Sequence, residues 1–310
     1  GTWFTFVNPV YSANYLYVFA KWLNTFHIHT FVMASGFLFY YLKIEKNKYN
    51  NYKQDIMKRF KRLIIPYIFT SMFWVIPISL YFFKYNFKEI FDKYVLCISP
   101  GQLWFLIMLF LVFILFEFLS NKIKISKMNL IIIYIVFTLL FGIIEYLNID
   151  YFQLPKVFEY SVFFYLGGYL YKFRNSFNYK KIIFIIIGII ILLLSNYLID
   201  DKNIIFKILK IYLSQLLSIL EVIIIYVIGN YLINKKKIKI NNKIYKLFES
   251  SSFGIYLFHQ QIIYFCIVLL NGLVHPIMQV IITFIISISI SLVMSLLLKK
   301  NNVTKVMFGL

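Results

Sequence analysis

The residue types best suited to binding a phosphate group lie in one short basic segment. The chain contains 32 Lys and Arg residues, and only Arg59, Arg62 and Arg174 are arginines. Arg59 and Arg62 are three positions apart and would share one face of a helix, with Lys58 and Lys61 beside them. A planar guanidinium can donate two parallel hydrogen bonds to a phosphate, which an ammonium cannot. The segment is therefore a candidate phosphate site, although these residues could serve only as cationic anchors at a membrane surface.

Two histidines are candidates for proton transfer. His259 lies about nine residues into an apolar helix, which would place it roughly 13 Å along the helix axis. A polar ring at this depth in a membrane is a candidate functional residue, and a histidine satisfied by a neighbouring helix is the structural alternative.

His27 and His29 are two positions apart and would point to different sides of a helix, which is unsuited to joint metal binding. We expect no metal site, and we expect Cys97 and Cys266 to be unpaired thiols because they are far apart in the sequence.

The deepest acidic residue is Glu221, about midway along the apolar stretch 208–233. It could orient a histidine or bind a sugar hydroxyl, and it could equally form a buried structural pair. Small residues gather at 34–36 and 167–168. Such patches permit close contact between helices, with room for a thin substrate as the alternative.

Membrane helices must position these residues. The chain of 310 residues has 61% hydrophobic and 14% charged residues, with a mean hydropathy of +0.78, whereas a soluble domain carries about 25% charged residues. Its apolar runs reach the length of about 18 residues that crosses a bilayer, and they do not alternate as barrel strands would. The sequence predicts an all-α, polytopic transmembrane helical bundle of about nine helices. We expect these helices at 26–42, 63–83, 102–120, 129–147, 158–173, 181–199, 208–233, 250–270 and 277–298.

The basic residues are distributed unevenly between the loops. If the loops alternate between two sides, twenty-four of the 32 Lys and Arg residues fall on one side. That side is cytoplasmic by the positive-inside rule. We therefore predict a multi-pass protein of the plasma membrane with a cytoplasmic C-terminus. The net charge of +20 follows from this topology, with some attraction to anionic membrane lipid, and we expect no nucleic-acid binding.

The start of the sequence suggests that a helix is missing. The chain begins with Gly1 and has no signal peptide, yet the charge distribution places its first residues outside. We expect one inward-to-outward helix to precede Gly1, and a native outside N-terminus is the alternative. Residues 1–310 are predicted to form a single membrane domain.

Five segments, read in order, resemble motifs of the acyltransferase 3 family of membrane acyltransferases. They are FHIHTFVMASGFL at 26–38, RFKRLIIPY at 59–67, LWFL at 103–106, FFYLGG at 163–168 and SFGIYLFH at 252–259. Each motif alone is weak, but their order and their positions in the predicted topology make the set specific. The resemblance extends from about residue 20 to about residue 300, so that the domain would be an N-terminally incomplete acyltransferase domain.

The family has ten helices and moves acyl groups, usually acetyl, from cytoplasmic acyl-CoA to hydroxyls of cell-surface sugars. The resemblance thus implies acetyl-CoA or another acyl-CoA as co-substrate, no permanently bound cofactor and a carbohydrate acceptor. It also implies a role in the bacterial cell envelope, with the polysaccharide synthesis machinery as a partner. By the same resemblance, Arg59, Arg62, Lys58 and Lys61 would hold the phosphates of the donor, and a donor channel would begin at Pro66.

The resemblance also bears on the general base. The first helix of the family carries a catalytic His, and that helix is the one expected to precede Gly1. Among the residues present, His259 is the preferred base and His27 the next, while Glu221 would orient or polarise. His29 stands where the family usually has proline. The alternative functions are a transporter or flippase of a lipid-linked saccharide or exopolysaccharide, and the membrane anchor of a larger receptor or modifying protein.

Overall fold

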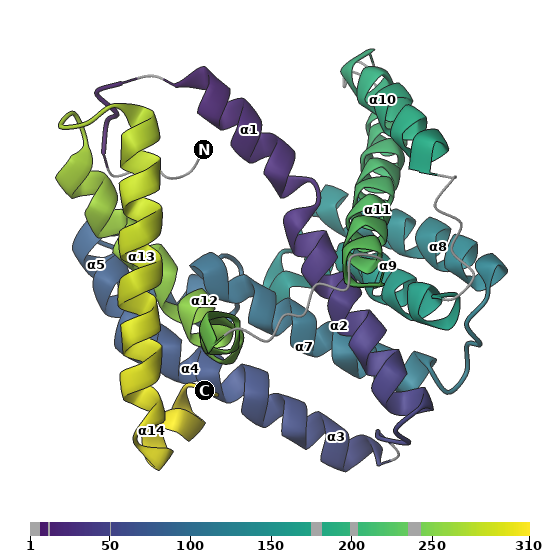
Figure 1. Ribbon diagram of the computed structural model, residues 1–310, viewed down its shortest axis with the longest axis horizontal. Coiled ribbons are helices and arrows are strands. Elements are labelled where there is room, and N and C mark those ends of the chain that lie inside the picture. The colour runs from purple at the N-terminus through teal and green to yellow at the C-terminus, as the bar shows by residue number, and fades with distance from the viewer. Residues whose placement is uncertain (1–6, 12, 50, 175–181, 199–203, 235–242) are drawn as a thin grey trace. The chain divides into compact units, whose positions relative to one another are not determined.

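A computed structural model describes residues 7–11, 13–49, 51–174, 182–198, 204–234 and 243–310, and the elements in these ranges are helices (Figure 1). Contacts within the chain divide it into two compact units. Unit 1 comprises Gly1–Phe19, Ile56–Phe110 and Ile240–Leu310, and unit 2 comprises Ala20–Asp55 and Leu111–Lys239. The helices α1 (Asn14–Asn24), α3 (Tyr52–Arg59) and α7 (Trp104–Leu119) contribute residues to both units.

The long helix Tyr52–Phe83 carries the basic segment into unit 1. Along it follow α3, the π-helical turn η2 (Phe60–Ile64), α4 (Ile65–Thr70), a second π-helical turn η3 (Ser71–Val75) and α5 (Ile76–Phe83). Each π-helical turn ends just before a segment whose second residue is proline, Pro66 or Pro77. Proline lacks an N–H and its ring clashes with the carbonyl of the preceding turn of an α-helix. A wider turn before each proline lets the helix continue without that clash.

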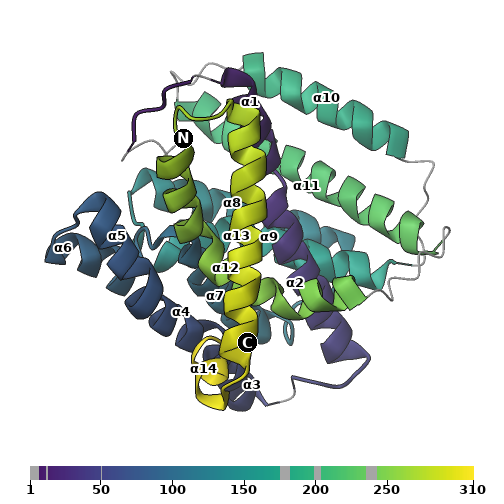
Figure 2. The same ribbon diagram turned by 60° about the vertical axis from the view of Figure 1, so that its left-hand side comes forward.

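Unit 1 also contains a close helix pair, α12 (Lys243–Leu270) and α13 (Pro276–Lys299), which lie side by side in both views (Figures 1 and 2). A stripe of small hydroxyl residues on α13, spaced four apart, is buried. Its members are Thr283, Ser287, Ser291 and Ser295. The short helix α14 (Asn302–Met307) follows α13 and contacts α4. Shorter elements of this unit are α6 (Phe87–Ile90), η4 (Phe91–Val95) and η5 (Gly101–Leu103).

Unit 2 is built around α9 (Leu154–Lys172), which packs against α2 (His27–Ile44) on one side and α8 (Lys127–Tyr146) on another. The unit also holds α10 (Ile182–Leu198), α11 (Ile204–Asn234) and the short η6 (Tyr151–Gln153). A Cβ atom added at Gly36 would overlap the backbone carbonyl of Phe164, and one at Gly167 would overlap the carbonyl of Met33. The prediction that the small-residue patches serve helix packing is therefore confirmed, because no gap is left there for a thin substrate.

The structure confirms the predicted all-α bundle and gives a helix at each of the nine predicted positions. Most ends agree within about four residues, but α3 begins at Tyr52 and α12 at Lys243, well before the predicted starts at 63 and 250. The basic segment is therefore part of a helix and does not precede one. Among the described residues, six helices are long and apolar enough to cross a membrane. They are Tyr52–Phe83, Gly101–Leu119, Lys127–Tyr146, Ile205–Leu232, Lys243–Leu270 and Pro276–Lys299.

Candidate functional site

The predicted site residues fall in two groups, one in each unit. Lys58, Arg59, Lys61, Arg62 and His259 belong to unit 1, whereas His27 and Glu221 belong to unit 2. Each group is described within its own unit.

The basic segment of unit 1 presents three exposed cations and one buried one. Arg59 ends α3 and its exposed fraction is 7%, while Lys58, Lys61 and Arg62 are exposed. The π-helical turn η2 begins at Phe60, directly between the two arginines. Because a π-helix turns less per residue than an α-helix, positions three apart no longer superpose as an α-helix would place them. The expectation that Arg59 and Arg62 share one helix face therefore does not hold, since Arg59 is buried and Arg62 is exposed.

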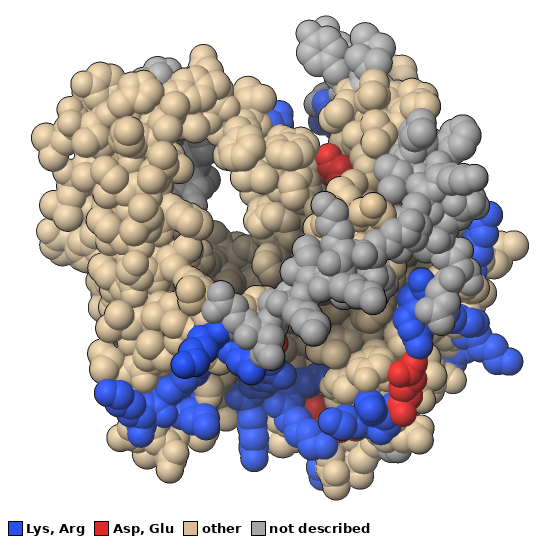
Figure 3. Space-filling view, viewed as in Figure 1, with Lys and Arg blue, Asp and Glu red and all other residues tan. Residues whose placement is uncertain are grey.

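Other basic side chains of unit 1 lie near this segment. Figure 3 shows Lys and Arg side chains of this unit gathered over α3, α14 and the beginning of α12, while the surface of α13 farther from this end carries none. This clustering at one end of long apolar helices agrees with the loop charges that predict a cytoplasmic side there.

Pro66, where a donor channel was predicted to begin, is buried. A Cβ atom added at Gly309 would lie 2.7 Å from Cγ of Pro66 and 3.1 Å from the ring of Phe253. The ring of Phe308 packs on that of Phe258, with centroids 5.6 Å apart. The residues after α14 thus lie against the helix at Pro66, and the channel itself stays a prediction.

His259 lies within α12 and is half-buried. Its Nδ1 atom is 3.0 Å from the carbonyl oxygen of Ile255 and 2.9 Å from that of Tyr256. A carbonyl oxygen can only accept, so Nδ1 carries the proton and donates it there. In the neutral imidazole, Nε2 then keeps its lone pair and can accept a proton from another group.

The turn of α12 around His259 is fixed by neutral hydrogen bonds to Gln102 of η5, just before α7. The side chains of Gln102 and Gln261 donate to each other over 2.7 and 3.1 Å. The Tyr256 hydroxyl donates to the carbonyl oxygen of Gln102 over 2.5 Å. Three of the groups in these bonds are amides or carbonyls and the fourth is a hydroxyl, so this turn of α12 is held by neutral groups. Within the described residues, His259 has no acidic hydrogen-bond partner.

The surroundings of Cys97 disfavour its thiolate. Cys97 and Cys266 are both free of disulfides, as predicted. The Tyr67 hydroxyl lies 3.3 Å from Sγ of Cys97 and donates to the Tyr94 carbonyl over 2.6 Å. Burial raises the pKa of the Cys97 thiol, although the Tyr67 hydroxyl partly offsets this, and only a thiolate is nucleophilic.

In the part of the chain that the structure describes, no group of three or more His, Cys, Asp or Glu side chains could hold a metal ion.

The two predicted site residues of unit 2 are not paired with each other. Nδ1 of His27 lies 2.8 Å from the carbonyl oxygen of Leu23, so its Nε2 keeps a lone pair as in His259. Oε2 of Glu221 accepts a hydrogen bond of 2.7 Å from the Thr25 hydroxyl. Glu221 therefore fixes the turn before α2, and an orienting role toward His27 has no direct contact to support it.

His29, for which the sequence indicated no role, lies beside an ion pair of unit 2, that of Lys156 and Glu159. Its Nε2 atom is 3.6 Å from Oε1 of Glu159, and Nζ of Lys156 is 2.8 Å from Oε2 of the same carboxylate. The imidazole is 6% exposed and lies against the rings of Tyr160 and Phe163, at centroid distances of 4.8 and 4.4 Å. The sequence signal was an acidic residue in one apolar helix and a histidine in another, but their pairing depends on the contact between α2 and α9.

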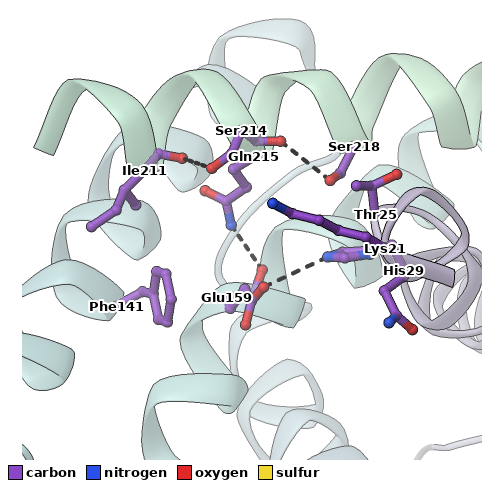
Figure 4. A pocket seen from close by; sticks show the side chains of 10 residues that line it. Lys21, Thr25, His29, Phe141, Glu159, Ile211, Ser214, Gln215 and Ser218 are labelled. Atoms are coloured by element: carbon purple, nitrogen blue, oxygen red, sulfur yellow. Dashed lines mark hydrogen bonds and ion pairs between the residues drawn. The ribbon is translucent and has the colours of Figure 1, made fainter. Parts of the chain in front are cut away.

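A cavity of about 240 Å³, lined by both polar and apolar groups, lies beside this ion pair (Figure 4). His29 and Glu159 form part of its wall, and α11 supplies Gln215, whose side chain donates to the carbonyl oxygen of Glu159 over 3.0 Å. The residues that line the cavity do not include His27 or Glu221.

Comparison with known proteins adds the family. A family model described as an acyltransferase domain matches residues 2–296. No curated protein and no solved structure gives a significant match. The match spans nearly all of a chain whose helices are long and apolar enough to cross a membrane. The chain therefore belongs to the acyltransferase 3 family and is a membrane acyltransferase.

Proposed function

We propose that the protein is an O-acyltransferase of the plasma membrane that moves an acyl group, most simply acetyl, from cytoplasmic acyl-CoA to a hydroxyl of a cell-surface or exported polysaccharide. The observation that carries the proposal is the exposed basic segment on a helix long enough to span the membrane. Membership of the acyltransferase family supplies the reaction type. The C-terminus would face the cytoplasm, and the polysaccharide synthesis machinery would supply the acceptor.

The basic segment suits the phosphates of an acyl-CoA. Lys58, Lys61 and Arg62 are exposed, so that an anion can reach them from the water side. The guanidinium of Arg62 can bind one phosphate through two hydrogen bonds. Arg59 is buried behind them, where its charge adds to the positive potential of the segment with little screening by salt. We assign donor binding to these four residues.

A histidine whose Nε2 carries the lone pair can act as the general base. The sugar oxygen attacks the thioester carbon, a C–O bond forms, and the sugar proton passes to Nε2. The C–S bond then breaks, and the CoA thiolate leaves and takes up a proton. His259 is the preferred base because its Nδ1 is fixed by two carbonyl oxygens, and His27 is second because one carbonyl oxygen fixes it. Glu221, through Thr25, would position the turn that leads to His27.

Transfer of radiolabel from acetyl-CoA to polysaccharide tests the proposal. Membranes containing the protein are incubated with labelled acetyl-CoA, and the polysaccharide is then isolated and counted. The expected result is label in the polysaccharide and its loss in His259→Ala. Unlabelled polysaccharide from wild-type membranes that still move the saccharide across the bilayer would favour a transporter or flippase.

Conservative arginine variants test the donor site. Arg62→Lys keeps the charge but loses the planar fork, so the KM for acetyl-CoA should rise about tenfold, which corresponds to about 1.4 kcal/mol. Arg59→Lys keeps the buried charge and should raise the KM less. Arg174→Lys is the matched control, because this arginine lies in unit 2 and pairs with Glu45. A KM for acetyl-CoA that is the same in all three variants as in the wild type would remove the basic segment from the donor site.

A further inference from the structure

The cavity of unit 2 is lined by side chains from helices that are far apart in the sequence. Lys21 and Asn24 come from α1, Glu159 from α9, and Ser214 and Ser218 from α11. Figure 4 shows the side chains of Lys21 and Gln215 extending toward a common space beside Glu159 and His29. The cavity therefore has a built polar wall within one unit.

The wall offers both hydrogen-bond acceptors and donors. Ser218 donates its proton to the carbonyl oxygen of Ser214 over 3.2 Å, and Ser214 donates to that of Ile211 over 3.0 Å. Their hydroxyl oxygens thus keep lone pairs that can accept. Glu159 adds a carboxylate with acceptor positions beyond its two cation contacts. The ammonium of Lys21 and the amide of Asn24 supply donors.

One part of the wall is apolar. Phe141 of α8 and Ile211 of α11 lie opposite the polar groups in the lining. A wall with one apolar face and several fixed donors and acceptors is typical of sites for small polar molecules. A sugar ring presents such a pattern, because its hydroxyls both donate and accept around a face of C–H groups. A hydrocarbon chain would leave the polar wall unpaired, which is costly.

The size of the cavity limits what can bind. About 240 Å³ is below the roughly 300 Å³ at which sites for drug-sized ligands begin. The cavity therefore has room for about one monosaccharide ring.

The cavity lies near the helix ends that the loop charges predict to face outside. Its residues come from the end of α1, the start of α2, the first turns of α9 and the first half of α11. These regions adjoin the loops with few basic residues, which is the outer side by the positive-inside rule. An acceptor on the cell surface would reach this end of unit 2 without crossing the membrane.

We propose that this cavity binds one glycosyl unit of the polysaccharide acceptor, with Asn24, Ser214, Ser218 and Glu159 contacting its hydroxyls and Phe141 its C–H face. The acceptor role rests on the proposed acyl transfer, whereas the binding of a sugar does not. In this arrangement Glu159 and Ser218 set specificity by accepting from particular hydroxyls. A site that hydrogen-bonds a substrate hydroxyl rejects analogues that lack it, because its own polar groups are then left unpaired.

Binding of simple glycosides tests the proposal directly. The purified full chain in detergent is mixed with methyl glycosides of hexoses, N-acetylhexosamines and uronic acids, and bound sugar is detected by saturation-transfer NMR. At least one glycoside should bind to the wild type. Asn24→Ala removes one neutral donor and should raise the Kd about fivefold. Ser214→Phe places a ring in the cavity and should abolish binding.

Ile228→Phe is the matched control, because Ile228 is exposed on the same helix and does not line the cavity. It should bind the glycoside as the wild type does. Size-exclusion chromatography shows whether Ser214→Phe folds. If it does not, the Kd of Asn24→Ala still tests the sugar site, because Asn24 is exposed and its replacement should not disturb folding. The proposal is overturned if no glycoside binds to the wild type, or if Asn24→Ala and every folded cavity variant bind with unchanged Kd.

The acetyl-CoA assay separates the two proposals. If wild-type membranes transfer no label but the glycoside binds and Asn24→Ala weakens it, acyl transfer is wrong and the sugar site stands. If label is transferred and Asn24→Ala leaves the KM for the acceptor polysaccharide unchanged, the sugar site is wrong and acyl transfer stands. A raised acceptor KM with an unchanged KM for acetyl-CoA supports both.

Discussion

The helix pair α2–α9 in unit 2 and the helix pair α12–α13 in unit 1 both pack closely, but different atoms meet in them. At Gly36 and Gly167 the neighbouring atoms are backbone atoms of the other helix. At Gly254 on α12 the neighbouring atoms are those of the Ser295 side chain on α13. A side chain can be shortened or can change its rotamer, whereas a backbone carbonyl cannot move without moving its helix. The first pair should therefore tolerate substitution less than the second.

The two pairs also differ in their polar groups. His29 on α2 contacts the carboxylate of Glu159 on α9 across the first pair. The α12–α13 pair buries hydroxyls on α13, and among the described residues the oxygens of Thr283, Ser291 and Ser295 have no hydrogen-bond partner. An unpaired charge in a membrane is far more costly than an unpaired hydroxyl. The contact of α2 with α9 thus depends on particular partners, whereas that of α12 with α13 depends on small size.

Gly36→Leu should have the largest effect. The new side chain would overlap the Phe164 carbonyl, so α2 and α9 would have to separate, and the folded protein should be lost. Ala34→Leu is the control, because Ala34 lies two residues earlier on α2 and is exposed. The check is the yield of monodisperse protein by size-exclusion chromatography after extraction in mild detergent. Equal yields for the two variants would mean that the helices are not in backbone contact.

This close contact could be predicted from the sequence, because glycine in an apolar segment has few other uses. The nine helices could be predicted for a similar reason, since runs of apolar residues report directly on membrane-spanning length. The short helices α1, α6 and α14 were not predicted, because a helix of a few turns carries no hydropathy signal long enough to detect. The early start of α3 was hidden by the polar residues of its first turns, such as Lys53 and Gln54.

The polar contacts could be predicted only in part. The exposed cations at 58–62 follow from residue types alone, but the π-helical turn that separates Arg59 from Arg62 depends on Pro66 further along the helix. The pair of His29 and Glu159 joins residues 130 positions apart, and only the register between α2 and α9 brings them together. Residue types on one helix cannot supply that register.

Glu159→Gln should have the second-largest effect. It leaves the charge of Lys156 and the imidazole of His29 without their carboxylate. Breaking a buried pair costs about 3–5 kcal/mol, but the side chain of Lys156 is 39% exposed and can reach water, so we expect about 2 kcal/mol. The measurement is the thermal unfolding midpoint in detergent. Glu249→Gln on α12, an exposed position, should leave the midpoint unchanged, and an equal midpoint for both variants would show that the ion pair contributes no stability.

Gly254→Ala should have a smaller effect on the α12–α13 pair. The added methyl group would meet the side chain of Ser295. Overpacking of this kind costs about 1–3 kcal/mol of unfolding free energy, and we expect a cost in the lower half of that range. Ser295→Gly opens the space and should restore most of the loss in the double variant, despite the cost of about 1 kcal/mol for glycine within a helix. The coupling is read from a double-mutant cycle of unfolding midpoints. Additive effects would mean that the two side chains do not meet.

Ser291→Ala should have the smallest effect and the opposite sign. The Ser291 hydroxyl is fully buried and has no partner among the described residues, so its removal relieves an unpaired polar group and should stabilise the protein by up to about 1 kcal/mol. Ser287→Ala, one turn earlier on the same stripe, loses a hydrogen bond of 3.1 Å to the Phe284 carbonyl and should be neutral or slightly destabilising. Unfolding midpoints of the two variants give the difference. If Ser291→Ala instead lowers acyl transfer while the midpoint is unchanged, the hydroxyl must bind something other than this chain, and the contrast between a partnered helix pair and one that depends on size alone would fail.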